Sequence, residues 1–204
     1  MEINAERVIE LVKSVRPLFM DHERASRITV KGAADFVTQV DFLVQERMRS
    51  GLFDMYPQVQ FMGEEKDNRD IDFSGAVWIL DPVDGTTNLI HDFRCSALSL
   101  ALCDRGQMEL GIIYQPYEDE LFLAQRGKGA FLNGNPIHVS SVKDLGQSLI
   151  SIGTSLITMI WQTGILRISS VYSSSALISG APVPRQWIWP MLPAEGWMHI
   201  SSVV

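Results

Sequence analysis

The chain has 204 residues, 46% of them hydrophobic, and a formal net charge of −7 at neutral pH. This length and apolar content can bury a large core, so we expect a globular protein with one large domain or two small ones. The acidic balance, with no long Lys/Arg run, excludes a nucleic-acid partner. No signal peptide core and no apolar stretch of about 18 residues is present, which predicts a cytoplasmic protein without a membrane partner.

Two amphipathic helices are predicted in the first part of the chain. Apolar residues recur at helical spacing from about Ala5 to Arg24, and again in DFVTQVDFLVQERMRSGLFDMYP from Asp35 onward. The second helix should end near Gly51 or Pro57. Between the two helices, the stretch RITVKGAAD predicts a short extended hairpin.

The middle of the chain predicts a sheet. VQFMGEE and AVWILD are short apolar runs that end in acids, as buried strands at a site do. Further strands alternate with the polar turns DRGQ, YED and RGKG, which favours antiparallel pairing; they span Ser96–Leu102, Gly111–Tyr114, Glu120–Ala124 and Gly129–Leu132. The predicted class is therefore α+β, with two helices and a mainly antiparallel sheet.

The two cysteines, Cys95 and Cys103, fall in sequence that is typical of adjacent buried strands. We therefore expect two reduced thiols rather than a disulfide or a metal pair.

Four acids stand where an apolar strand gives way to a loop, so two strand ends could form one acidic site; they are Glu64, Glu65, Asp81 and Asp84. In DPVDGTT, Pro82 fixes one backbone angle and Gly85 permits a turn that side chains forbid, which aims two carboxylates at one point. Carboxylate and carbonyl oxygens are the ligands that Mg²⁺ prefers. Backbone amides after Gly85 and the Thr86 hydroxyl could then meet a phosphate.

An ordinary turn is the competing interpretation, because Asp and Gly are common in turns and DxxDG alone is more often structural. The following Thr86, Thr87 and Asn88, together with the upstream GEE, favour the site. Glu65 and the four histidines are expected to be solvated or to pack, and neither His91 nor His138 has a partner spacing that suggests zinc.

Three motifs in order resemble the inositol monophosphatase family of Mg²⁺-dependent, lithium-sensitive phosphatases: DFVTQVD, GEE and WILDPVDGTTN. The similarity continues through GIIYQPYEDELFLAQRGKGAFLNGNPIHVS and covers about the first 155 residues. The resemblance implies the N-terminal part of a layered αβαβα fold, a phosphomonoesterase that hydrolyses a small phosphate ester such as myo-inositol monophosphate, and a homodimer, since members are often dimers.

The same resemblance assigns roles to individual residues. The metal ligands would be Glu64, Asp81, the carbonyl of Val83, and Asp84. Thr86, hydrogen-bonded to Asp41 and close to Glu64, would orient and deprotonate a metal-activated water, and the substrate phosphate would meet Asp84, Gly85 and Thr86. Two metal ions can clamp the attacking and leaving oxygens and make such a water acidic enough to attack at neutral pH.

The sequence departs from the family after Ser155. The family's second half has a Gly-Ser-Ala-Ala stretch, an Asp-Ala-Tyr-Phe-Glu stretch that contacts substrate, and a Trp-Asp whose aspartate binds metal, and none can be read here. Only three of the last 49 residues are charged, Arg167, Arg185 and Glu195, and four of the five tryptophans lie there. We therefore divide the chain into a metal-binding domain, 1–155, and an aberrant tail, 156–204.

A shifted reading frame explains the tail. In a frame displaced by one base, the codons across Met159 and Ile160, and across Trp187 and Ile188, must encode Asp, because Met and Trp each have one codon ending in G. Permitted codons elsewhere turn the segment 178–202 into DIRRSGSAAVDLAYVACGRMDAYFE, which contains the missing family pattern.

Loss of the second half would remove one metal-binding aspartate and the substrate wall, and would expose apolar area on the sheet. The alternative function is therefore a truncated non-catalytic remnant that binds metal or a partner without turnover. Other substrates of the superfamily, namely nucleotide 3′-phosphates, fructose bisphosphate and histidinol phosphate, also stay open.

The frame hypothesis makes a direct prediction about the gene. Sequencing the DNA around the Ser155 codon should reveal a single-base shift that restores the family pattern downstream. A DNA sequence in which no single-base shift near that codon does so would disprove the hypothesis.

Overall fold

The computed structural model describes residues 3–32, 35–64, 68–141, 143, 149–151 and 177–179. The chain divides into two compact units, one of residues 1–31 and 35–137 and the other of 32–34 and 138–204. In the second unit, strands β10 (Leu149–Ser151) and β11 (Leu177–Ser179) pair in parallel. Apart from these three residues of β11, the predicted tail 156–204 lies outside the described residues, and the domain division at 155 stays a prediction.

The first helical segment consists of three short helices, so the single helix predicted from Ala5 to Arg24 was wrong. They are α1 (Ala5–Lys13), α2 (Arg16–Phe19) and α3 (His22–Ala25). Pro17 lies in the first turn of α2. Its ring has no amide hydrogen and clashes with a preceding helical turn, so α1 has to end before it.

The second helix, α4 (Gln39–Met55), begins four residues later than predicted. Residues Asp35–Thr38 instead form strand β2, which pairs with β1 (Ile28–Gly32) in a two-stranded sheet. Thr38 caps α4, because its hydroxyl accepts a hydrogen bond from the amide of Val40 at 3.1 Å. The helix ends just before Pro57, as the sequence predicts.

A seven-stranded sheet forms the second layer of this unit, in the order β3-β4-β5-β6-β7-β8-β9. Its strands are β3 (Gln60–Gly63), β4 (Ala76–Asp84), β5 (Ala97–Asp104), β6 (Gln107–Gln115), β7 (Glu120–Gln125), β8 (Gly129–Leu132) and β9 (Asn135–Ile137). Every neighbouring pair is antiparallel except β3 and β4, which are parallel. The predicted α+β class with a mainly antiparallel sheet is confirmed, while β9 and the short helix α5 (Thr86–Ile90) were not predicted.

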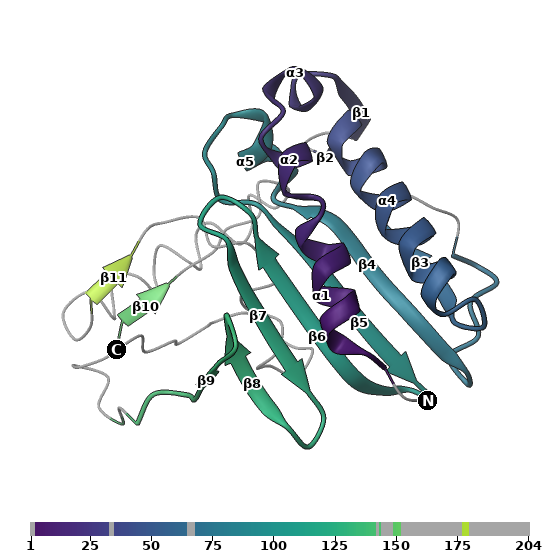
Figure 1. Ribbon diagram of the computed structural model, residues 1–204. Helices are drawn as coiled ribbons and strands as arrows, with labels where there is room; N and C mark the ends of the chain where they lie inside the picture. Colours follow the sequence, from purple (N-terminus) through teal and green to yellow (C-terminus); the bar gives the residue numbers. More distant parts are fainter. Residues whose placement is uncertain are drawn as a thin grey trace. The chain divides into compact units, whose positions relative to one another are not determined.

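The main core lies between the helices and one face of the sheet. Figure 1 shows α1 and α4 lying along this face, α4 over β3 and β4. Their apolar faces meet alternate residues of the central strands, and the fully buried members include Val12, Val44, Met48, Trp78 and Leu100. This packing holds β3 and β4, and therefore their polar ends, in fixed positions.

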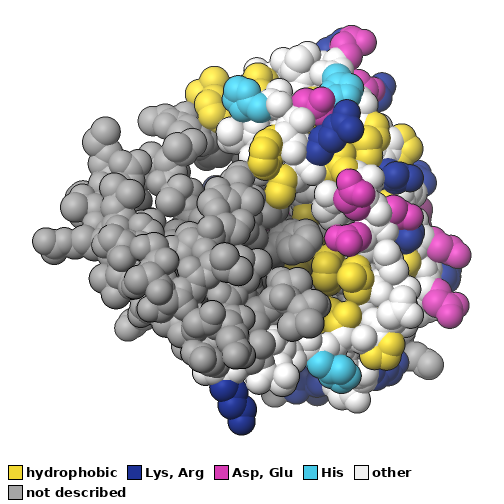
Figure 2. Space-filling model, turned by 90° about the vertical axis from the view of Figure 1, so that its left-hand side faces the viewer, with side chains coloured by type: hydrophobic (Ala, Val, Ile, Leu, Met, Phe, Trp, Pro, Cys, Tyr) yellow, Lys and Arg dark blue, Asp and Glu magenta, His cyan; other side chains and the backbone are white. Residues whose placement is uncertain are grey.

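The described surface mixes charges of both signs. Figure 2 shows acidic and basic side chains interspersed with apolar ones on one face, without a large basic patch among the described residues. Both cysteines are free thiols, as predicted. No described helix is both long enough and apolar enough to cross a membrane.

Replacing Met48 by Ala tests the packing of α4. Met48 is 0% exposed, so removing most of its side chain should lower the free energy of unfolding by about 2–5 kcal/mol. Phe42→Ala on the same helix is the matched control, because Phe42 is 49% exposed and its loss should cost less than about 1 kcal/mol. Urea unfolding followed by circular dichroism measures both, and equal losses would contradict the assigned core.

Candidate metal and phosphate site

The parallel pairing of β3 and β4 brings Glu64 next to Asp81. Gly63 pairs with Leu80, and the amide of Glu64 donates to the Leu80 carbonyl at 3.2 Å. Parallel strands end at the same edge of a sheet, so the acids that follow them emerge together. The sequence predicted one acidic site from two strand ends, and the structure brings those two ends together.

A β-bulge places Asp84 on the same site as Asp81. In the ladder between β4 and β5, Asp81 pairs with Ser99 and Asp84 with Ala97, so three residue steps on β4 oppose two on β5. Residues three apart in a regular strand point to opposite faces, and the extra residue cancels this alternation. Pro82 lies inside the bulge, where its missing amide hydrogen costs no ladder bond.

Gly85 closes the acidic turn, which we define as Asp81–Thr86. Its backbone is left-handed, with φ of 84°, and a Cβ at this position would lie 3.0 Å from the carbonyl oxygen of Cys95. Both facts require glycine. The side-chain amide of Asn88 donates to that same Cys95 oxygen at 2.7 Å, which ties the turn to the start of β5.

Thr86 links the acidic turn to α4. Its hydroxyl lies 3.0 Å from Oδ1 of Asp41 and 3.0 Å from the carbonyl oxygen of Val83. A hydroxyl has one proton, so it donates to only one of these oxygens at a time and keeps lone pairs for another donor. The Asp41–Thr86 hydrogen bond implied by the family resemblance is present.

Asp41 is held on its other side by Thr38. The buried carboxylate accepts hydrogen bonds at Oδ2 from the Thr38 amide, at 2.8 Å, and from the Thr38 hydroxyl, at 2.6 Å. Burial raises the pKa of Asp41 above its usual value, and these hydrogen bonds and that from Thr86 oppose the rise. Thr38 was not among the predicted site residues, although Thr38 and Asp41 in TQVD have the spacing of a capping box and could have identified it.

The carboxylates at the acidic turn repel one another. Burial first, and then the negative charges of Glu64 and Asp84, raise the pKa of Asp81 to about 9. A divalent cation would remove this penalty, since it favours the ionised form of every ligand. The chemistry of this donor set, carboxylates and a carbonyl, therefore fits Mg²⁺, although no three acidic, His or Cys side chains of the described part are already placed so that they could hold a metal ion.

All the predicted site residues that were assigned a role lie around this turn: Asp41, Glu64, Asp81, Val83, Asp84, Gly85 and Thr86. Glu65 lies outside the described residues.

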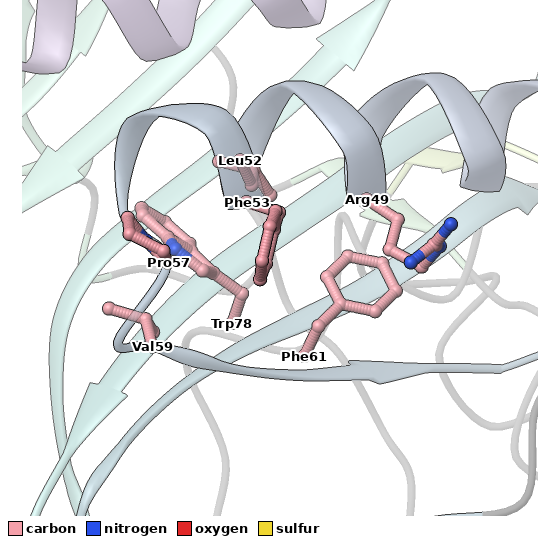
Figure 3. Close-up of a pocket in the computed structure, with 7 residues that line it drawn as sticks. All are labelled: Arg49, Leu52, Phe53, Pro57, Val59, Phe61 and Trp78. Carbon is pink, nitrogen blue, oxygen red and sulfur yellow. The ribbon is translucent and has the colours of Figure 1, made fainter.

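A separate cleft of about 190 Å³ opens between α4 and strands β3 and β4. Figure 3 shows mostly apolar side chains around it, with the guanidinium of Arg49 at one end. That guanidinium donates to Glu46 at 2.7 Å. The cleft contains no carboxylate from the acidic turn, so it is not the candidate site.

The raised pKa of Asp81 makes a prediction for metal-free protein. Between the ordinary value of 3.8 and about 9, the folded state keeps a proton that the unfolded state releases. The free energy of unfolding should therefore fall as pH rises through this window, by on the order of 1 kcal/mol per pH unit. Asp81→Asn should flatten the dependence when urea unfolding is measured in EDTA between about pH 5 and 8.

Asp72→Asn is the control for this experiment. Hydrogen bonds from Ser74 lower the pKa of the exposed Asp72, so it titrates below the window and its replacement should keep the wild-type slope. An unchanged slope in Asp81→Asn would show that this carboxyl does not hold the proton.

The chain is similar to known proteins over most of its length. The model of the Inositol monophosphatase family matches residues 1–161. An inositol monophosphatase from Dictyostelium discoideum is 39% identical over 150 residues, covering 72% of this chain and 55% of that protein. The extragenic suppressor protein suhB from Bartonella henselae has a TM-score of 0.77 at 28% identity, covering 86% of this chain and 69% of that one.

A third similar structure is that of inositol monophosphate bound SaIMPase-II, with a TM-score of 0.67 at 25% identity, covering 87% of this chain and 65% of that one. The chain spans about half the length of the curated relatives it matches. The family match extends across every residue of the acidic site, from Asp41 to Thr86. The chain belongs to the inositol monophosphatase family.

Proposed function

We propose that the acidic turn is the catalytic centre of a Mg²⁺-dependent phosphomonoesterase that hydrolyses a small phosphate ester such as myo-inositol monophosphate. The observation that carries the proposal is the convergence of Asp81, Asp84 and Glu64 beside the Thr86–Asp41 hydrogen bond. Family membership and the inositol monophosphate named for SaIMPase-II support the substrate class.

Four groups would hold the metal: the carboxylates of Glu64, Asp81 and Asp84 and the carbonyl of Val83. When bound, Mg²⁺ supplies positive charge that acidifies a water and offsets the charge of the phosphate. The Val83 carbonyl already faces the site, since the Thr86 hydroxyl lies 3.0 Å from it. Such a charge would offset the burial and the repulsion from Glu64 and Asp84 that raise the pKa of Asp81.

Thr86 and Asp41 are the proposed path for the proton of the attacking water. When the Thr86 hydroxyl donates to Asp41, its oxygen can accept a proton from water, with Glu64 orienting the same water. Burial keeps the pKa of Asp41 above its usual value, which makes this carboxylate a better final acceptor. Thr38 keeps Asp41 in place through its two hydrogen bonds.

The substrate phosphate would lie over Gly85 and Thr86, with Asp84 beside it. With no side chain, Gly85 lets a ligand approach the backbone closely, and the following amides are neutral donors that tolerate the nearby carboxylates. The groups that would select the alcohol part of the ester are not among these residues, so nucleotide 3′-phosphates, fructose bisphosphate and histidinol phosphate are substrates to test alongside inositol monophosphate.

Metal binding without turnover is the second candidate function. It is favoured by one fact, that the sequence departs from the family pattern after Ser155. The acidic turn would then retain its carboxylates and bind Mg²⁺ without hydrolysing an ester.

Substitutions at Thr86 separate these two functions. In a phosphate-release assay with Mg²⁺ and myo-inositol monophosphate, Thr86→Ala and Asp41→Asn should each lower kcat by about 10²–10⁴-fold, the usual value of a proton-transfer group. Thr86→Ser should retain most of the wild-type kcat, because serine keeps the hydroxyl. Asp84→Ala should abolish turnover together with Mg²⁺ binding.

Thr87→Ala is the matched control, an adjacent threonine with no assigned role, and should retain wild-type kcat. Lithium should inhibit any turnover that depends on the site, as the family resemblance implies. Mg²⁺ binding detected by calorimetry in a folded chain with no turnover on any of the four substrates would reject the enzyme and support the binding function.

A further inference from the structure

Ser96 is fully buried directly behind the acidic turn, at the residue before β5 begins. Its hydroxyl donates to the carbonyl oxygen of Gly85 at 2.9 Å. A buried hydroxyl normally needs such a partner. The same Gly85 carbonyl also accepts a hydrogen bond from the amide of Leu89 at 3.1 Å. The Gly85 oxygen is therefore fixed by two donors from different elements.

Tyr117 supports Ser96 from the other side. The phenol of Tyr117 hydrogen-bonds to the Ser96 hydroxyl. Because the Gly85 carbonyl has no proton, the single proton of Ser96 is used on that carbonyl, and the lone pairs of the Ser96 oxygen stay available on the side of Tyr117. Burial raises the pKa of Tyr117, and its hydrogen bond with Ser96 opposes the rise.

The position of Tyr117 is itself fixed by α2. Phe19 meets the Tyr117 ring edge to face, with centroids 6.5 Å apart. Arg16 donates through Nε to the Pro116 carbonyl at 2.8 Å and through Nη2 to the Tyr117 carbonyl at 3.4 Å. A continuous set of contacts thus runs from α2 through Tyr117 and Ser96 to the acidic turn.

The Gly85 carbonyl shares one peptide plane with the amide of Thr86. The described chain has no cis peptide bonds, so this carbonyl and this N–H point in opposite directions across a rigid unit. Gly85, as a left-handed glycine, has the fewest conformational restraints of its own. The hydrogen bonds that fix the Gly85 oxygen therefore also fix the direction of the Thr86 N–H, which points the opposite way.

We infer that Ser96, supported by Tyr117, is a positioning residue that orients the Thr86 amide toward the phosphate of the substrate. The inference rests on the proposed function for the phosphate, but the orientation of the amide is independent of it. Neither residue belongs to the metal, phosphate or proton-transfer groups proposed above.

Backbone NMR on the full chain tests the orientation directly. In wild type, the Thr86 N–H should be rigid, with an order parameter near 0.85, and Ser96→Cys should lower it below about 0.6 and change its residual dipolar coupling. Cysteine fills the space of serine but is a weak donor. Ser96→Ala is a second variant that replaces Ser96→Cys if the cysteine variant folds poorly. Tyr117→Phe should lower the Thr86 order parameter by an intermediate amount.

Ser14→Ala is the matched control. The Ser14 hydroxyl also donates to a backbone carbonyl, that of Leu11 at 2.6 Å, and accepts from a side chain, Arg47 at 3.2 Å, but it lies at the end of α1. Its removal should leave the Thr86 signal unchanged.

Calorimetry with inorganic phosphate and Mg²⁺ supplies the second measurement. Ser96→Cys should weaken phosphate binding roughly three- to ten-fold, the effect of one hydrogen bond, and Ser14→Ala should not. Unchanged order at Thr86 in Ser96→Cys, or unchanged phosphate affinity, would overturn the inference. If the wild-type protein binds no phosphate, but the order parameter of the Thr86 amide still falls in Ser96→Cys, the positioning role stands and the proposed function fails.

Discussion

The site depends on one constraint, which is that several carboxylates are held close together at a sheet edge where their charges repel. The pKa of Asp81 shows the cost, since burial and two neighbouring acids raise it to about 9. A flexible loop would relieve such repulsion by moving apart. Here the β3–β4 ladder fixes Glu64, the bulge at Pro82 fixes Asp84, and the core under Trp78 and Leu80 keeps both strands in place.

The same elements serve the fold and the site at once. Asp41 completes the capping box of α4 through Thr38, and with its other oxygen it accepts the hydroxyl of Thr86. Gly85 lies between the end of β4 and the start of α5, and it packs closely against the Cys95 carbonyl. A substitution at either position therefore changes local stability and the arrangement of the site together.

Local sequence was enough to predict the α+β class and the strands that carry the acids, while the roles of the residues around DPVDGTT stay a prediction. Other features depend on pairing that local sequence does not specify. The parallel direction of β3 against β4 is set by the chain path between them, and the contact of Tyr117 with Ser96 joins residues from two different loops. The break of the first helix was readable from Pro17 but was outweighed by the continuing apolar spacing around it.

Strand β3 lies at one end of the seven-stranded sheet and has only four residues, with a single neighbouring strand. Terminal strands of this kind open more readily than central ones. Glu64 directly follows such a strand, whereas Asp81 and Asp84 lie on β4, which pairs with β5 from Ala76 to Asp84 and with β3 from Val77 to Leu80. Opening of β3 would release one of the four proposed metal-binding groups while leaving three in place. Metal binding at the proposed site and the closing of this strand would therefore be thermodynamically linked, each favouring the other.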